Sequence, residues 1–161
     1  VTSWNKNTSV KFRTDVASMC KLGFDIGLKD MTADELAYCQ DAVANWKRLQ
    51  PAIMDGDQYR LVSPYETNHM AVNYVSKDQK KAVLFAYDVY PRFQEKLINV
   101  KLQGLDPNKT YKVEEINLMP GVDSALKSNG QTYTGDYLMK VGIEVFGFAA
   151  TQSHVLELTA M

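Results

Sequence analysis

The sequence of 161 residues has no long apolar run and no excess of charge of either sign. No stretch approaches the roughly 18 to 20 apolar residues that cross a bilayer, and none has the basic, apolar and small-residue order of a signal peptide. The 18 basic residues nearly balance the 19 acidic ones, so the chain has no large basic surface for nucleic acid or anionic lipid. We therefore expect neither a membrane nor a nucleic acid as partner.

Cysteine is also scarce. Cys20 and Cys39 are the only two in the sequence, which is too few for the disulfide framework of a small secreted domain. Each lies among apolar residues, and we expect two buried, reduced thiols. A bridge between them or a reactive thiol remains the alternative.

Metal and phosphate motifs are missing as well. His69 and His154 are far apart in the sequence, and no cluster of histidine, cysteine or carboxylate has the spacing of metal ligands. The segment 142–147 contains two glycines, but apolar strand residues lie between them and no phosphate-binding lysine follows. We expect hydrogen-bonded structural histidines, no metal and no cofactor.

The residues that are present have the composition of a globular protein, with 45% apolar and 23% charged residues. In the first half, Val10 to Met19 has the spacing of a short amphipathic helix that begins after residue 7, 8 or 9. Lys21 to Leu28 alternates apolar and other residues and contains two glycines. This pattern predicts a short strand.

The clearest local signal is a capping box, in which Thr32 and Glu35 each satisfy a free backbone amide at the start of a helix. Apolar residues then recur at spacings of three and four and form one stripe. The stripe consists of Leu36, Cys39, Val43, Trp46 and Leu49. Proline is unfavourable inside a helix, so we expect Pro51 to end this one.

After residue 57 the apolar period falls to two, which predicts seven or eight short strands. The alternating positions are Tyr59 and Leu61, Val72 and Tyr74, Val83, Phe85 and Tyr87, Ile98, Val100 and Leu102, Tyr111 and Val113, Ile143 and Val145, and Leu156 and Leu158. Turn pairs such as Asn129-Gly130 separate them. Several such strands at regular spacing favour an antiparallel β-sandwich.

The order helix, strand, capped helix in the first half is that of the last βα units of a TIM barrel. The predicted fold is thus mainly β with an α/β amino-terminal remnant. Residues 1–56 form the end of a (β/α)8 barrel, and residues 57–161 form an antiparallel β-sandwich. Two βα units cannot close a barrel, and the chain begins with Val1 rather than Met. We therefore expect the natural start to lie upstream.

Several stretches resemble glycoside hydrolase family 36, the α-galactosidases and raffinose-processing enzymes. Residues 12–26 (FRTDVASMCKLGFDI) are similar to the family's passage from the seventh barrel helix into the eighth strand. Residues 45–50 (NWKRLQ) resemble the eighth helix, and residues 55–64 (DGDQYRLVSP) resemble the entry into the carboxyl-terminal β-domain. Gly104 to Pro107, followed by Tyr111, is a weaker match.

The resemblance implies that this chain is the carboxyl-terminal fragment of a glycosidase that hydrolyses terminal α-D-galactosyl residues, as in raffinose or melibiose. Family members use two aspartates, which retaining enzymes hold about 5 to 5.5 Å apart. In the family both lie upstream of the matching region. We therefore expect no catalytic, substrate-binding or metal-binding residue in this fragment, and a supporting role for it.

The resemblance also implies an oligosaccharide substrate for the parent enzyme and a possible homo-oligomer. The compartment stays open, and a bacterial type of parent in the cytoplasm or periplasm is one option. Two other functions remain open for the fragment. It could be a carbohydrate-binding module, or a domain for contacts between subunits. Because the other units of the barrel are absent from this chain, we also expect the stripe around Leu36 and Trp46 to be partly unprotected.

Carboxylates and aromatics are the remaining candidates for chemistry within the fragment. Neither Asp15 with Asp25 nor Asp55 with Asp57 has a catalytic signature, and the second pair flanks Gly56 as in a turn. The tyrosines and phenylalanines at alternating strand positions are expected in the core. Trp46 is on the helix stripe, and Trp4 lies near the start of the chain. Exposed aromatics could stack on sugar.

Overall fold

The computed structural model describes residues 1–2, 8–92 and 94–161. In chain order, its elements are helix α1 (Val10–Ser18), the 3-10 helix η1 (Leu28–Asp30), helix α2 (Ala33–Asp55), strands β1 (Asp57–Val62), β2 (His69–Val75), β3 (Lys81–Asp88), β4 (Thr110–Ile116) and β5 (Thr132–Thr134), helix α3 (Gly135–Lys140) and strand β6 (Gln152–Ala160). Among these residues no helix is both long enough and apolar enough to span a membrane. Trp4 lies outside the described residues.

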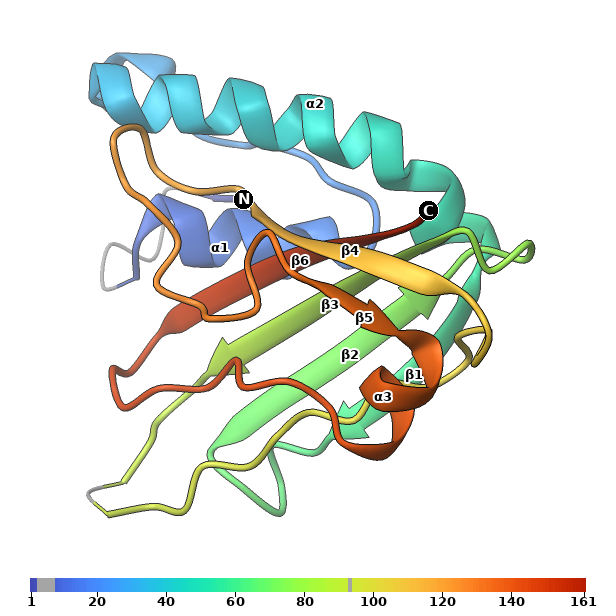
Figure 1. Cartoon of the computed structure of the whole chain (residues 1–161). Helices are drawn as coiled ribbons and strands as arrows, with labels where there is room; N and C mark the ends of the chain where they lie inside the picture. The colour runs from blue at the N-terminus through green and yellow to red at the C-terminus, as the bar shows by residue number, and fades with distance from the viewer. Residues whose placement is uncertain (3–7, 93) are drawn as a thin grey trace.

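The strands form one six-stranded sheet in the order β1-β2-β3-β6-β4-β5. Every strand pair is antiparallel. The carboxyl-terminal strand β6 lies between β3 and β4, so the end of the chain is in the middle of the sheet (Figure 1). The predicted antiparallel β-domain is confirmed.

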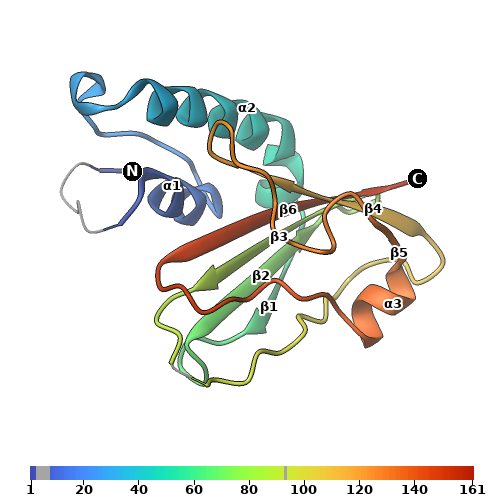
Figure 2. The same cartoon turned by 60° about the vertical axis from the view of Figure 1, so that its left-hand side comes forward.

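Helices α1 and α2 cover one face of the sheet, and α3 lies on the other (Figure 2). The helix-side core contains Leu49 and Ile53 of α2, packed against Val72, Phe85 and Val155 of three adjacent strands. Every one of these side chains is nearly inaccessible to solvent. The amino-terminal helices and the sheet therefore share a core.

The opposite face of the sheet is covered by extended segments rather than by assigned strands. Val100 and Ile143, both predicted in strands, exchange two backbone hydrogen bonds of 2.9 and 3.1 Å and form an isolated bridge. Gly142 permits this approach: it has a φ of +78°, and a Cβ there would lie 2.3 Å from the Val100 oxygen. Among the described residues the six-stranded sheet is thus the only sheet, and the two segments that cover this face are joined at an isolated bridge in place of the second sheet of the predicted sandwich.

Both helix starts form as predicted. The Ser9 hydroxyl accepts a hydrogen bond of 3.1 Å from the Phe12 amide at the start of α1. In the capping box of α2, the Thr32 hydroxyl accepts from the Glu35 amide at 3.2 Å. In return, the Glu35 carboxylate accepts from the Thr32 amide at 2.9 Å.

The prediction that Pro51 ends the second helix is wrong. Helix α2 continues to Asp55, with Pro51 on its exposed side. A proline inside a helix costs about 3 kcal/mol. The next two residues, Ala52 and Ile53, are buried in the helix-side core, and burying a side chain such as isoleucine contributes about 1.5 to 3 kcal/mol. Packing against the sheet therefore sustains the last turn.

The predicted strand Lys21 to Leu28 is also absent from the structure. Asp25 alone forms an isolated parallel bridge, to Thr2, and the chain enters η1 at Leu28. A strand needs a neighbour along its length, and within the described residues the backbone hydrogen bonds of this segment to Val1, at Gly23 and Asp25, form only that isolated bridge. The short elements β5 and α3 were not predicted, because each is too short to show a period.

The stripe along α2 is partly unprotected, as predicted. Leu36 is 36% exposed, whereas Val43 and Trp46 are half-buried and Cys39 is buried. The expectation of two buried thiols is wrong for Cys20, which is exposed just beyond the end of α1. Its apolar neighbour Met19 takes the place against the core instead.

Candidate functional site

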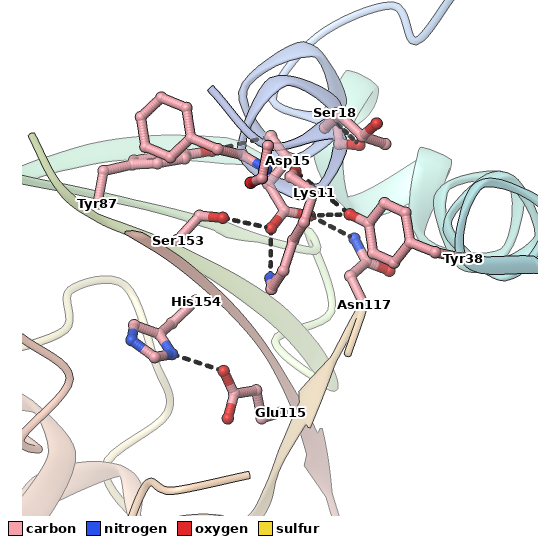
Figure 3. Close-up of polar contacts among 12 residues, drawn as sticks. Lys11, Asp15, Ser18, Tyr38, Tyr87, Glu115, Asn117, Ser153 and His154 are labelled. Atoms are coloured by element: carbon pink, nitrogen blue, oxygen red, sulfur yellow. Dashed lines mark hydrogen bonds and ion pairs between the residues drawn. The ribbon is translucent and has the colours of Figure 1, made fainter. Parts of the chain in front are cut away.

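The most extensive polar cluster in the described chain surrounds Asp15 of α1. This side chain is fully buried, and its carboxylate is the acceptor for groups from three other elements. Tyr38 of α2 donates its hydroxyl at 3.0 Å, Asn117 donates its amide at 2.9 Å just after β4, and Ser153 of β6 donates at 2.7 Å. Lys11, one turn earlier in α1, completes the site with an ion pair of 2.6 Å (Figure 3).

The backbone at Asp15 is tied down as well, since its carbonyl accepts a hydrogen bond of 2.8 Å from the Tyr87 hydroxyl of β3. Burial raises the pKa of the Tyr87 and Tyr38 hydroxyls, and the negative charge of Asp15 raises both further. Both tyrosines therefore remain protonated and act as donors at any ordinary pH. A buried carboxylate with this many donors and a paired lysine is well compensated.

A pair formed by His154 and Glu115 lies beside the Asp15 cluster, on the neighbouring strands β6 and β4 (Figure 3). The His154 Nδ1 is 2.6 Å from the Glu115 carboxylate, which also accepts a hydrogen bond from Ser124. Burial opposes ionisation of Glu115, but these two bonds outweigh it and lower its pKa. A cavity of about 430 Å³ adjoins the pair, and its wall also contains Lys11 and Met119.

His69 and Asp88 form a second pair, at the far ends of β2 and β3. They are 2.7 Å apart and almost fully buried. The amide of Gly147 donates to the other Asp88 oxygen at 2.9 Å, and the Phe146 ring packs on the imidazole with centroids 4.6 Å apart. Burial raises the pKa of Asp88 despite these partners. Both histidines are thus hydrogen-bonded to carboxylates, as expected.

Helix α2 has an ionic link of its own to the sheet. Glu157 of β6 accepts from Arg48 of α2 at 2.5 Å and from Lys81 of β3 at 2.6 Å. The Glu157 side chain is mostly buried, while both cations reach the solvent. This contact and the Asp15 cluster both join the first 56 residues to the sheet.

Residues 69–158 match the model of the glycosyl hydrolase family 36 C-terminal domain. This chain belongs to that family. It is 34% identical over 136 residues to probable alpha-galactosidase C of Aspergillus flavus, a match that covers 84% of this chain and 16% of that protein.

Solved structures agree with this assignment. The GH36 alpha-galactosidase AgaB of Geobacillus stearothermophilus superposes with a TM-score of 0.83 at 27% identity, over 100% of this chain and 21% of that one. A variant of AgaA from the same organism, solved in complex with stachyose, gives a TM-score of 0.83 at 26% identity over the same shares of both chains. The chain spans about a sixth of the length of the curated relatives it matches.

The family 36 match begins at the first residue of β2, so helices α1 and α2 and strand β1 lie outside the matched residues, whereas α3 lies inside them. Asp15 and Ser153 therefore connect a helix outside the match to a strand inside it. Arg48 and Glu157 do the same from α2. In this family 36 domain the polar clusters hold the helical segment against the β-domain.

The carboxylates singled out in the sequence do not form a pair. Asp15 lies in the buried cluster, and Asp25 is in the bridge to Thr2. Asp57 forms an ion pair with Lys77, and Asp55 is the last residue of α2. None of their contacts joins two of them, and within the described residues no group of three or more histidine, cysteine or carboxylate side chains could hold a metal ion.

Sequence reasoning missed the role of Asp15. One signal was present in the sequence, the polar residues Thr14, Asp15 and Ser18 within one turn of the predicted helix, and the structure shows that all three are buried. Small polar residues at these spacings on one side of a helix indicate a polar contact with the sheet. The aromatic predictions fared better: Tyr74, Phe85, Tyr87 and Tyr111 are in the core, while Tyr59 is half-buried.

Proposed function

We propose that this chain is the carboxyl-terminal part of an α-galactosidase and that it supports the catalytic domain without taking part in catalysis. The support for the activity is that the relatives which match most of this chain are named alpha-galactosidases. The chain corresponds to only 16 to 21% of their length. Catalysis would then depend on residues elsewhere in the longer protein.

The proposed division places residues 1–56 at the end of a (β/α)8 barrel and residues 57–161 in the β-domain. The segment Lys21 to Leu28 would gain strand neighbours from the rest of such a barrel. The partly exposed apolar stripe of α2 that includes Leu36 would be covered by the same missing elements. The missing barrel elements would thus explain both features.

The observation that carries the supporting role is the Asp15 cluster. It fixes α1 to strands β3 and β6 through hydrogen bonds that are fully buried. Catalytic groups on barrel strands must be held within about 0.5 Å of their productive positions by a surrounding structure that does not move. A retaining glycosidase needs its two carboxyl groups about 5 to 5.5 Å apart, and displacement of a barrel helix would alter that separation.

The proposed substrates of the longer protein are oligosaccharides with terminal α-galactosyl residues. AgaA, one of the similar proteins, has been solved in complex with stachyose. No residue of the present chain is proposed to contact the galactosyl group being transferred.

The experiment compares the chain of 161 residues with the longer protein on a chromogenic α-galactoside. The longer protein should hydrolyse it and the chain alone should not. Hydrolysis by the chain alone, abolished by replacing one of its own aspartates, would refute the non-catalytic role. If the longer protein were inactive on every α-galactoside, the proposed activity would be refuted.

A homo-oligomer remains a prediction. Light scattering of the longer protein would test it.

A further inference from the structure

A groove of about 840 Å³ lies on the helix side of the sheet, where the helices leave strand β1 uncovered. Its floor contains Met70 and Val72 of β2. The end of α1 with Val16 forms one wall, and the turn of residues 63–66 forms the other. This volume is within the range of about 300 to 1,000 Å³ that is usual for small-molecule sites.

The turn presents Tyr65 to solvent. This ring is 99% exposed, more than any other large hydrophobic side chain of the described residues. The turn itself is well ordered: the Tyr65 amide donates to the Ser63 hydroxyl at 3.3 Å, and the amides of Glu66 and Thr67 donate to the Ser63 carbonyl at 3.2 and 3.1 Å. These bonds order the turn backbone, and a tyrosine side chain has only two torsions, so the ring loses little entropy when a ligand stacks on it.

Polar groups of both signs surround the ring. Arg60 and Glu66 are exposed at the groove, and within the described chain neither side chain has a hydrogen bond or an ion pair. Gln58 donates to the Tyr74 hydroxyl at 2.9 Å, and that hydroxyl donates to the Met19 carbonyl at 2.7 Å. The Gln58 oxygen and the two free charged groups thus remain available for a ligand.

This combination selects a neutral ligand that has many hydroxyl groups and one apolar face. A strongly anionic ligand would meet Glu66, and a cationic one would meet Arg60. The hydroxyl groups of a sugar instead bond to planar protein side chains: carboxylates accept hydrogen bonds, guanidinium groups donate them, and amides do both. The apolar face of the sugar ring packs on an aromatic side chain.

We propose that this groove is an accessory binding site for galacto-oligosaccharides, separate from the catalytic centre. The choice of galactosyl sugars rests on the proposed function. Tyr65 stacks on one sugar ring, Arg60 and Glu66 bond its hydroxyl groups, and the half-buried Met70 contacts the apolar face of the next unit. Such a site would hold a longer substrate on the enzyme between catalytic events.

The test is titration with stachyose. Binding to the chain is followed by calorimetry and by amide shifts in NMR spectra, and binding to a catalytically inactive form of the longer protein is followed by calorimetry with and without Tyr65→Ala. We expect saturable binding, with the largest shifts at Arg60, Tyr65 and Met70. Tyr65→Ala and Arg60→Ala should each weaken binding at least tenfold. Tyr90→Ala is the matched control, because Tyr90 is 73% exposed but is outside the groove, and it should leave binding unchanged.

Three results would overturn the site. They are the absence of saturable binding by the chain, binding by the chain that Tyr65→Ala does not weaken, and the absence of any Tyr65-dependent binding in the longer protein because other residues cover the groove. Cellotetraose binding as tight as that of stachyose would overturn the galactosyl preference. Hydrolysis of a chromogenic galactoside by the longer protein is scored separately, so failure of the groove is distinguishable from failure of the proposed activity.

Discussion

The Ser153 hydroxyl donates a hydrogen bond of 2.7 Å to Asp15, although 138 residues separate the two. One residue belongs to the first helix and the other to the last strand, so this contact brings the two ends of the chain together. Tyr38, Asn117 and Lys11 bind the same carboxylate. Four elements therefore depend on one buried charge.

Replacing Asp15 should destabilise the whole chain. In Asp15→Asn the new amide would direct N–H groups at Tyr38 or Asn117, and Lys11 would lose its counter-charge. Removing one partner of a buried ionic cluster costs on the order of 3 kcal/mol. The measurement is urea unfolding followed by circular dichroism.

Asp41→Asn is the matched control, since Asp41 is exposed on α2, and its effect should be below about 0.5 kcal/mol. Equal stability of the two variants would contradict the central role of the Asp15 cluster.

Acid should weaken the link between α2 and the sheet. Burial opposes ionisation of Glu157, but hydrogen bonds from Arg48 and Lys81 outweigh it and hold the pKa of this carboxyl below its ordinary value. A carboxyl with a lowered pKa in the folded chain stabilises the fold above the unfolded pKa of about 4.3. That contribution is lost as pH falls through the folded value.

The free energy of unfolding, measured from pH 7 to pH 3, should accordingly fall below about pH 4.3. Glu157→Gln should be less stable at pH 7 and should lose less on acidification. Glu144→Gln, at an exposed ion pair with Lys127, should follow the parent curve. Parallel curves for Glu157→Gln and the parent would exclude this linkage.

Two glycines with the same backbone conformation allow a test of the bridge on the far face of the sheet. Gly142 and Gly121 have φ values of +78° and +73°, but a Cβ on Gly142 would meet the Val100 oxygen at 2.3 Å, whereas a Cβ on Gly121 would meet nothing within 4 Å. Gly121→Ala should cost about 1 to 2 kcal/mol, the ordinary penalty of the left-handed region. Gly142→Ala should cost distinctly more in thermal and urea unfolding, and equal costs would mean that the close approach to Val100 does not matter.

The two thiols should differ in reactivity. Cys20 is exposed, whereas Cys39 is buried and its burial raises the pKa of its thiol. Because the thiolate is the reactive form, an aromatic disulfide reagent should modify one thiol quickly in the folded chain. The second thiol should react only in denaturant, and Cys20→Ser should abolish the fast phase. A fast phase that survives in Cys20→Ser would place Cys39 within reach of solvent.

Local features were readable from the sequence because each depends on residues close together in the chain. The capping box of Thr32 and Glu35 needs only four residues, and the alternation along β3 needs only one strand. The family was readable for the same reason, since short stretches such as residues 55–64 preserve its pattern. An antiparallel β-domain followed from these signals, and it is present.

Other features depend on contacts between distant residues, and these only the tertiary structure decided. Pro51 remains in a helix because Ala52 and Ile53 pack on the sheet, a gain that no local pattern contains. Asp15 becomes a buried centre only because β6 inserts between β3 and β4 and brings Ser153 to it. The groove beside Tyr65 exists because the helices leave the edge of the sheet uncovered. The propensity for a helix, a strand or a turn depends on neighbouring residues, whereas the burial of side chains and charges depends on how the whole chain packs.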